Sequence, residues 1–168
     1  MSQSNHKESF KLLVESADSN GFSSRRAVGK ERLEDIDLVI WPNASPNKAF
    51  AIALKKTLLK KSSKRKHLWG WVELTDKDGN DGWIYKKCTF VAYERKDDFV
   101  LLQKNDLRHW IQANNLARWD MPFVSNSWAA SYRLYRRPNT KEAIFQIKIS
   151  DAIKNCRHHF WKKHERGS

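Results

Sequence analysis

The apolar positions near the N-terminus of this chain recur at helical spacing. Phe10, Leu13, Val14 and Ala17 follow one another every three or four residues, which places them on one side of a helix. The glycine at position 21 supplies a plausible C-terminal stop. The pattern therefore predicts a first helix that begins near residue 8.

The spacing then changes to short β-branched and aromatic runs between turn residues, which is typical of strands. Runs at 36–41 and 49–54 flank a turn-rich sequence and predict a hairpin. Further strands are expected at 68–75, 83–85, 88–94, 99–103, 132–136 and 143–149.

Two later helices are predicted from residues that favour helix N-caps. Asn105 and Asp106 precede helical spacing at 107–111, and Asp151 precedes a basic segment that runs as far as Trp161. The order of helices and strands favours an α+β fold, with a central mixed, mostly antiparallel sheet flanked by helices. We expect one domain over residues 1–166, with residues 167–168 as a cloning remnant.

The charge of the chain indicates a partner rich in phosphate. It contains 32 Lys and Arg against 19 Asp and Glu, for a formal net charge of +13. The basic residues cluster between Lys48 and Lys66 without an acidic residue among them, whereas the segment 31–37 is acidic. Patterned charge of this kind favours a docking surface for nucleic acid, with a generally basic surface as the alternative.

Other classes are disfavoured by what the sequence lacks. Cys88 and Cys156 belong to no paired-cysteine motif, which argues against a zinc site or a disulfide framework. No apolar run approaches the roughly 20 residues that a bilayer span needs, and the first residues lack an apolar signal core. We therefore expect a cytoplasmic protein without a membrane partner.

One pair of predicted strands resembles the core motif of the PD-(D/E)XK nuclease superfamily. That family carries an aspartate on one strand, and an acidic residue, any residue and a lysine on the next. The corresponding positions here are Asp37, Ala53 and Lys55. The strand pattern that follows, as far as residue 103, is similar to that of small phage and restriction-type endonucleases, and the resemblance spans residues 8–153.

The resemblance implies a restriction-endonuclease-like sheet and an endonuclease that hydrolyses DNA phosphodiester bonds with Mg²⁺ or Mn²⁺. Asp37, position 53 and the carbonyl of Leu54 would hold the metal, and Lys55 would orient water or stabilise negative charge. Residues two apart on a strand face the same side, so positions 53 and 55 project together. A plain ion pair between Asp37 and Lys55 is the structural alternative.

The sequence departs from the family at position 53, because an alanine methyl cannot bind a metal ion. The chain as written is therefore expected to be catalytically impaired. Three explanations stay open: an engineered loss of the acidic residue, migration of the carboxylate to Glu73, and either a naturally inactive binding protein or a misread motif. Glu8 or Glu15 would be the first-helix acid that the family often uses, and Asp35 is a further candidate beside Asp37.

The residues expected to contact nucleic acid follow the presumed active strand or lie near the later aromatic residues. They are Lys56, Lys60, Lys61, Lys64, Arg65, Lys66, Arg133, Arg136 and Arg137. We expect DNA as the partner, and the sequence leaves RNA and a homodimer open. A flexible solvated loop is the alternative for the lysine-rich part, and an acidic protein partner would also match the charge.

Overall fold

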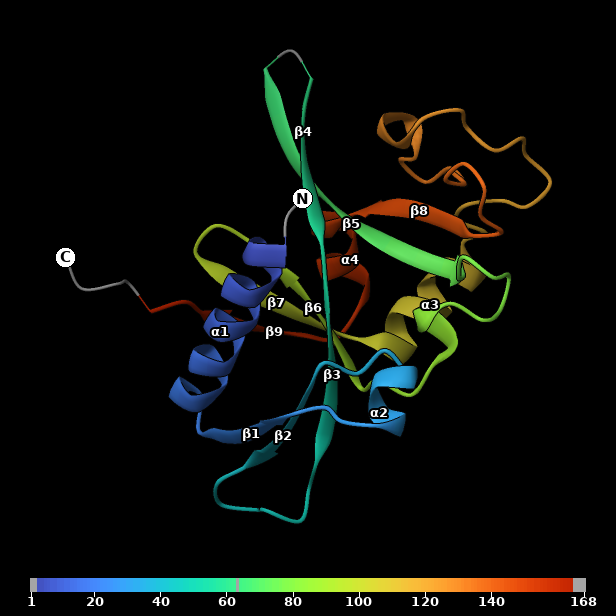
Figure 1. Cartoon of the computed structure of the whole chain (residues 1–168). Coiled ribbons are helices and arrows are strands. Elements are labelled where there is room, and N and C mark those ends of the chain that lie inside the picture. Colours follow the sequence, from blue (N-terminus) through green and yellow to red (C-terminus); the bar gives the residue numbers. More distant parts are fainter. Residues whose placement is uncertain (1–2, 63, 165–168) are drawn as a thin grey trace.

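The computed structural model describes residues 3–62 and 64–164 of the chain (Figure 1). The helices are α1 (Gln3–Ser19), α2 (Lys30–Leu33), α3 (Lys104–Ala113) and α4 (Ile149–Asn155), with 3-10 turns η1 (Trp83–Tyr85) and η2 (Ser127–Ala129). The strands are β1 (Phe22–Arg26), β2 (Leu38–Pro42), β3 (Phe50–Lys55), β4 (Thr57–Ser62), β5 (Arg65–Thr75), β6 (Phe90–Glu94), β7 (Asp98–Gln103), β8 (Ala143–Lys148) and β9 (His158–Lys162).

Within the described residues the strands form two sheets, one of six strands in the order β1-β2-β3-β6-β7-β9 and one of three in the order β4-β5-β8. The first sheet is antiparallel except where β3 pairs with β6 in parallel. A parallel pair needs a crossover, and here the chain makes it through β4, β5 and η1. These sheets and helices confirm an α+β fold with a mixed sheet, whereas a restriction-endonuclease-like topology stays a prediction.

The two faces of the first sheet have different cover. Helix α1 packs Leu13 and Ala17 against Leu38 and Ile52, which alternate with the residues of the opposite face. On that opposite face Ala53 belongs to a small apolar cluster that also contains Val39 and Cys88. Alternation along β2 and β3 therefore separates an apolar, helix-covered face from the face that carries the motif positions.

The second sheet packs on the first through a larger apolar cluster that includes Tyr93, Phe145 and Leu107. The hydroxyl of Tyr93 donates a hydrogen bond to the Trp71 carbonyl at 2.8 Å, so the ring spans the two sheets. Gly70 makes this contact possible, because a Cβ atom there would lie 2.6 Å from the Tyr93 ring.

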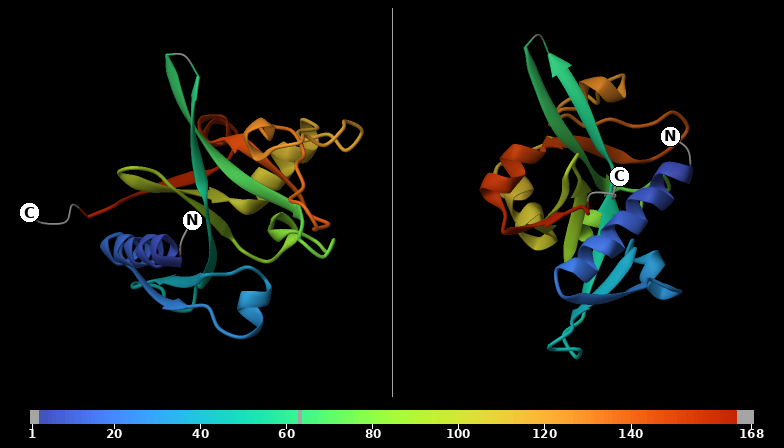
Figure 2. Two further views of the ribbon diagram at one scale, coloured as in Figure 1. Left: turned by 45° about the horizontal axis from the view of Figure 1, so that its top comes forward. Right: turned by 90° about the vertical axis from the view of Figure 1, so that its left-hand side faces the viewer.

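Strands β4 and β5 form a hairpin that extends beyond the rest of the molecule (Figures 1 and 2). The lysine-rich segment, for which the sequence predicted no strand, forms β4 and the start of β5. β4 follows β3 after a single residue, Lys56, so the chain passes almost straight from one sheet into the other. The hairpin therefore begins where β3 ends. We call β3 the motif strand, because it carries Ala53 and Lys55.

Three predictions for local structure were wrong. Residues 83–85 form a 3-10 turn. Residues 132–136 form no strand, and of these five Tyr135 makes isolated bridges, because Tyr132 adopts φ 52° and interrupts an extended strand. The C-terminal helix ends at Asn155, and Trp161 lies on β9, where pairing with β7 prevails over helical spacing. Residues 167–168 lie outside the described residues. No helix in the described part of the chain is long and apolar enough to cross a membrane.

Candidate functional site

Asp37 stands immediately before β2 and is held by the backbone of its neighbours. Its amide donates to the Ile52 carbonyl at 2.9 Å, and its own carbonyl accepts from the Ala27 amide at 3.0 Å. Its half-buried carboxylate accepts a hydrogen bond from the Leu54 amide at 2.8 Å. The carboxylate expected to need a partner inside an apolar strand thus has a backbone amide as that partner.

Ala53 and Lys55 share one face of the sheet, because they lie two residues apart on β3. The pairing of β2 with β3 has Val39 opposite Ala51 and ends with Leu38 opposite Ile52, and the amide of Asp37 donates to that same Ile52 carbonyl. Val39 and Ala51 lie in the small cluster on the side away from α1, and Ala53 lies there with no exposed surface. A longer side chain at position 53 would therefore start from inside this cluster.

Lys55 forms its ion pair with Asp35 rather than with Asp37. Its ammonium nitrogen lies 3.9 Å from Asp35 Oδ1 and 5.4 Å from the centre of the Trp83 ring. Lys86 donates to the other oxygen of Asp35 at 2.8 Å, and this hydrogen bond raises the pKa of Lys86. Asp35 therefore pairs with two lysines beside β3 and offsets part of their charge.

Glu73 extends from β5 into this charged group. Its Oε1 accepts a hydrogen bond from the Trp83 amide at 3.3 Å. Burial raises the pKa of Glu73, the negative charge of Asp35 raises it further, and the charges of Lys55 and Lys86 act in the opposite direction. The proposed migrated carboxylate thus lies within electrostatic range of Asp35 and Lys55.

A cavity of about 1040 Å³ lies between the N-terminal half of α1, the ends of β1 and β2, and the junction of β3 with β4. Asp37, Leu54 and Lys55 line it together with Glu8. Glu15, by contrast, lies two turns further along α1 and pairs with Lys11 at 3.9 Å on the surface. The geometry therefore favours Glu8 over Glu15 as the first-helix acid of this site.

The cavity wall also contains Lys56, which was expected to contact nucleic acid, and three basic residues that the sequence analysis did not select, namely Lys7, Arg26 and Arg32. The Arg26 guanidinium lies 4.0 Å from the centre of the Phe10 ring, which holds it against the helix. These cations come from α1, β1, the segment around α2 and the β3–β4 junction. Because Lys7, Arg26 and Arg32 are scattered along the chain, only the fold brings them together, and no local pattern in the sequence could have identified them.

Comparisons with protein-family models, curated proteins and solved structures find no match to this chain.

The side chains present do not complete the metal site that the resemblance implies. Among residues 3–62 and 64–164, no three His, Cys, Asp or Glu side chains are grouped so that they could hold a metal ion. Ala53 offers only a methyl group, and the Asp37 carboxylate is already hydrogen-bonded to Leu54. A divalent cation prefers several oxygen ligands, so this chain lacks at least the carboxylate expected at position 53.

Lys60 differs from the other residues between 56 and 66 that were predicted to contact nucleic acid, because it is only 9% exposed. Its ammonium group donates to the Trp128 carbonyl at 2.6 Å and to Ser131 Oγ at 2.5 Å. Burial lowers the pKa of Lys60. Lys60 therefore attaches the 114–131 loop to the hairpin. The other basic residues of this predicted group are exposed, namely Lys56, Lys61, Lys64, Arg65 and Lys66.

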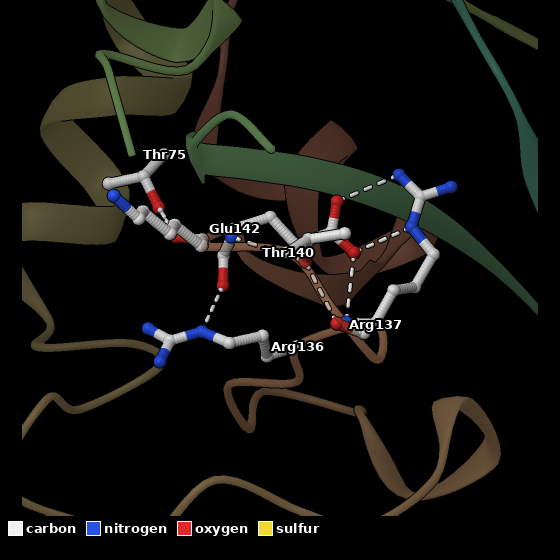
Figure 3. Close-up of polar contacts among 6 residues, drawn as sticks. Thr75, Arg136, Arg137, Thr140 and Glu142 are labelled. Carbon is white, nitrogen blue, oxygen red and sulfur yellow. Dashed lines mark hydrogen bonds and ion pairs between the residues drawn. The ribbon is translucent and has the colours of Figure 1, made fainter. Parts of the chain in front are cut away.

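The three arginines predicted to contact nucleic acid all bind neighbouring parts of the protein. Arg137 donates two hydrogen bonds, of 2.5 and 2.8 Å, to the buried carboxylate of Glu142 (Figure 3). The backbone carbonyl of Glu142 accepts a further hydrogen bond from Arg136 at 2.9 Å. Arg133 donates to the Pro122 carbonyl at 3.0 Å. These contacts order the loops around β8, and a role in nucleic-acid binding stays a prediction for all three.

Proposed function

We propose that this chain binds DNA on the scaffold of a metal-dependent endonuclease, and that Ala53 has removed hydrolysis while leaving binding. The observation that carries the proposal is the cavity in which Asp37, Lys55 and Glu8 meet at the foot of the basic hairpin. These residues come from the three elements in which the resemblance expects the site. The basic residues around the cavity favour a phosphate group there.

The place of position 53 on β3 supports its proposed role. An acidic side chain there would stand next to Leu54 and Lys55, which line the cavity together with Asp37. In such a parent form, a bound Mg²⁺ or Mn²⁺ would supply a Lewis acid and an activated water. Lys55 is placed to neutralise negative charge on a bound phosphate, once it is released from Asp35.

A second candidate function, binding without any hydrolysis, is favoured by the surroundings of Ala53. The methyl group is fully buried beside Val39 and Cys88, so a carboxylate there would lose much of its hydration. Burying a charge without a partner is costly, and an alanine avoids that cost. In this second candidate function, the protein is a regulator or inhibitor that binds a nucleic-acid site without cutting it.

Restoring the carboxylate separates the two candidates. Ala53→Glu is expected to nick supercoiled plasmid in the presence of Mg²⁺ or Mn²⁺ at least about a hundredfold faster than Ala53→Gln. This ratio is typical of the rate enhancement that one catalytic group contributes. Ala53→Gln has nearly the same volume without the charge, so it controls for overpacking. Addition of Asp37→Asn to Ala53→Glu should abolish the activity again.

Binding is measured in parallel by gel shift at low salt, and folding of each variant by circular dichroism. A folded Ala53→Glu protein that binds DNA but does not cut it rejects the endonuclease scaffold and supports binding alone. If the original chain shifts neither DNA nor RNA at low salt, both candidates fail, and an acidic protein partner becomes the better explanation of the charge.

A further inference from the structure

The outer part of the β4–β5 hairpin carries positive charges that face one another across the strands. Lys61 pairs with Lys66, and Ser62 with Arg65, at positions directly opposite in the antiparallel register. Within the described residues, none of these basic side chains forms an ion pair. Like charges directly opposite destabilise a hairpin, and a bound polyanion would remove that repulsion.

An exposed tryptophan lies beside this hairpin. Trp128 is on η2, in the middle of the long connection between α3 and β8, and 56% of its surface is exposed. Figure 1 shows this loop next to the hairpin, and the contact of Lys60 with the Trp128 carbonyl joins the two. More than half of the Trp128 surface is therefore open to a ligand that could stack on the ring.

The backbone that carries Trp128 is fixed at several points. The Asn126 side chain accepts a hydrogen bond from the Ala129 amide at 3.0 Å, which caps η2. The Gln146 side chain on β8 donates to the Ser127 carbonyl at 3.0 Å. An exposed ring on an ordered backbone loses little conformational entropy when a ligand stacks on it.

Lys60 also fixes the position of the indole relative to the hairpin. Its ammonium nitrogen lies 5.7 Å from the Trp128 ring centre and 5.0 Å from the Trp69 ring centre, so the cation contacts both rings. Alternation along the strands places Arg65 on the face of the hairpin that carries Lys60 and Trp69. One face of the hairpin therefore combines basic groups with aromatic rings.

We infer that Trp128 and the β4–β5 hairpin form a binding surface for single-stranded DNA. An unpaired base stacks on the exposed indole, and the phosphate next to it contacts Arg65 on the same face. The strand then continues around the outer part of the hairpin past Lys64, so that its next phosphates contact Lys61 and Lys66 on the opposite face. A duplex buries the faces of its bases, so it could use the cations but not the tryptophan. The inference rests on the proposed binding of DNA and adds which form of DNA the protein prefers.

Fluorescence anisotropy with a labelled oligothymidylate, and with a duplex of the same length, tests this surface on the full chain. Trp128→Ala should weaken binding of the single strand about tenfold, within the range of one base–aromatic stack, and leave duplex binding nearly unchanged. Trp128→Phe should restore most of the affinity because it keeps a ring. Trp119→Ala is the matched control, since Trp119 is 57% exposed and packs on Phe123 instead of the hairpin.

Each outcome bears on a different part of the inference. Equal losses in Trp128→Ala and Trp119→Ala, or an equal loss for duplex and single strand, would overturn the assignment of stacking to Trp128. Tighter binding of oligouridylate than of the DNA strand would overturn the choice of DNA. Duplex binding that is insensitive to Trp128, without preference for a single strand, rejects this surface and spares the proposed function, whereas absence of all binding rejects both.

Discussion

Two basic regions of this molecule use their charges in different ways. Around the motif strand, Lys55 and Lys86 are paired with Asp35, and Lys163 contacts Glu94 at 2.7 Å. On the outer hairpin, Lys61 and Lys66 stand opposite each other with no carboxylate among their described partners. The lysines named in the first region are offset by neighbouring carboxylates, while those of the second have their charge available for a ligand.

The difference separates charges that serve the fold from charges that serve binding. An ion pair on a partly exposed surface adds little stability, but it lowers the attraction of its lysine for a phosphate. We therefore expect the hairpin to supply most of the salt-dependent affinity for nucleic acid. In the cavity, Lys55 would add affinity only when a ligand displaces Asp35 from it.

The largest expected effect follows from removing the opposed charges of the hairpin. Lys61→Gln combined with Lys66→Gln should weaken binding of a single strand at low salt by about tenfold or more, and lower the salt slope of log K by about 1.4, or about 0.7 per lost phosphate contact. Relief of like-charge repulsion should raise the free energy of unfolding by a few tenths of a kcal/mol. Anisotropy titrations at several salt concentrations and urea denaturation measure both.

The matched control for this pair removes the same charge elsewhere. Lys96→Gln combined with Lys154→Gln alters two exposed lysines on the β6–β7 turn and on α4. If this control lowers the salt slope as much as the hairpin variant does, binding depends on net charge alone and the contrast between the two regions disappears.

A smaller effect is expected from freeing the lysines beside the motif strand. Asp35 adopts φ 57°, which asparagine tolerates well, so Asp35→Asn removes the charge without straining the backbone. Loss of the carboxylate should tighten DNA binding about threefold at low salt and lower the free energy of unfolding by no more than about 1 kcal/mol. Unchanged affinity would show that Lys55 and Lys86 do not approach the bound nucleic acid.

The sequence was sufficient for elements whose signal is local. The turn between the runs that became β2 and β3 predicted that hairpin close to its observed bounds. The helical spacing of Phe10 to Ala17 predicted α1, which begins at Gln3, earlier than expected. The charge of the lysine-rich segment was equally plain. Its strand conformation was not, because lysines give no alternating apolar pattern, and pairing with β5 determines it.

What the sequence could not predict depends on contacts between distant segments. The ion pair between Lys55 and Asp35, the burial of Lys60 under the Trp128 loop, and the choice of Glu8 over Glu15 all depend on how elements pack. The C-terminal residues were misassigned for the same reason, since an edge position beside β7 stabilises β9 in spite of its helical spacing. Local periodicity carries no information about such neighbours.

The smallest effect concerns Glu73, whose pKa lies above its ordinary value of 4.5. A carboxyl group with a raised pKa in the folded state binds more protons there than in the unfolded chain. Its contribution to stability is therefore full below about pH 4.5 and declines as the pH rises through the folded-state pKa.

Glu73→Gln keeps an acceptor for the Trp83 amide and removes the charge. The variant should match the original chain at acid pH and exceed it by a few tenths of a kcal/mol at pH 7, a small gain because Glu73 is partly exposed. Urea denaturation across this pH range measures the difference. A gain confined to neutral pH means that the chain retains an unfavourable carboxylate beside Lys55, as functional sites often do. Equal stability at both pH values would make Glu73 a plain structural acceptor and remove it as a candidate for the migrated acid.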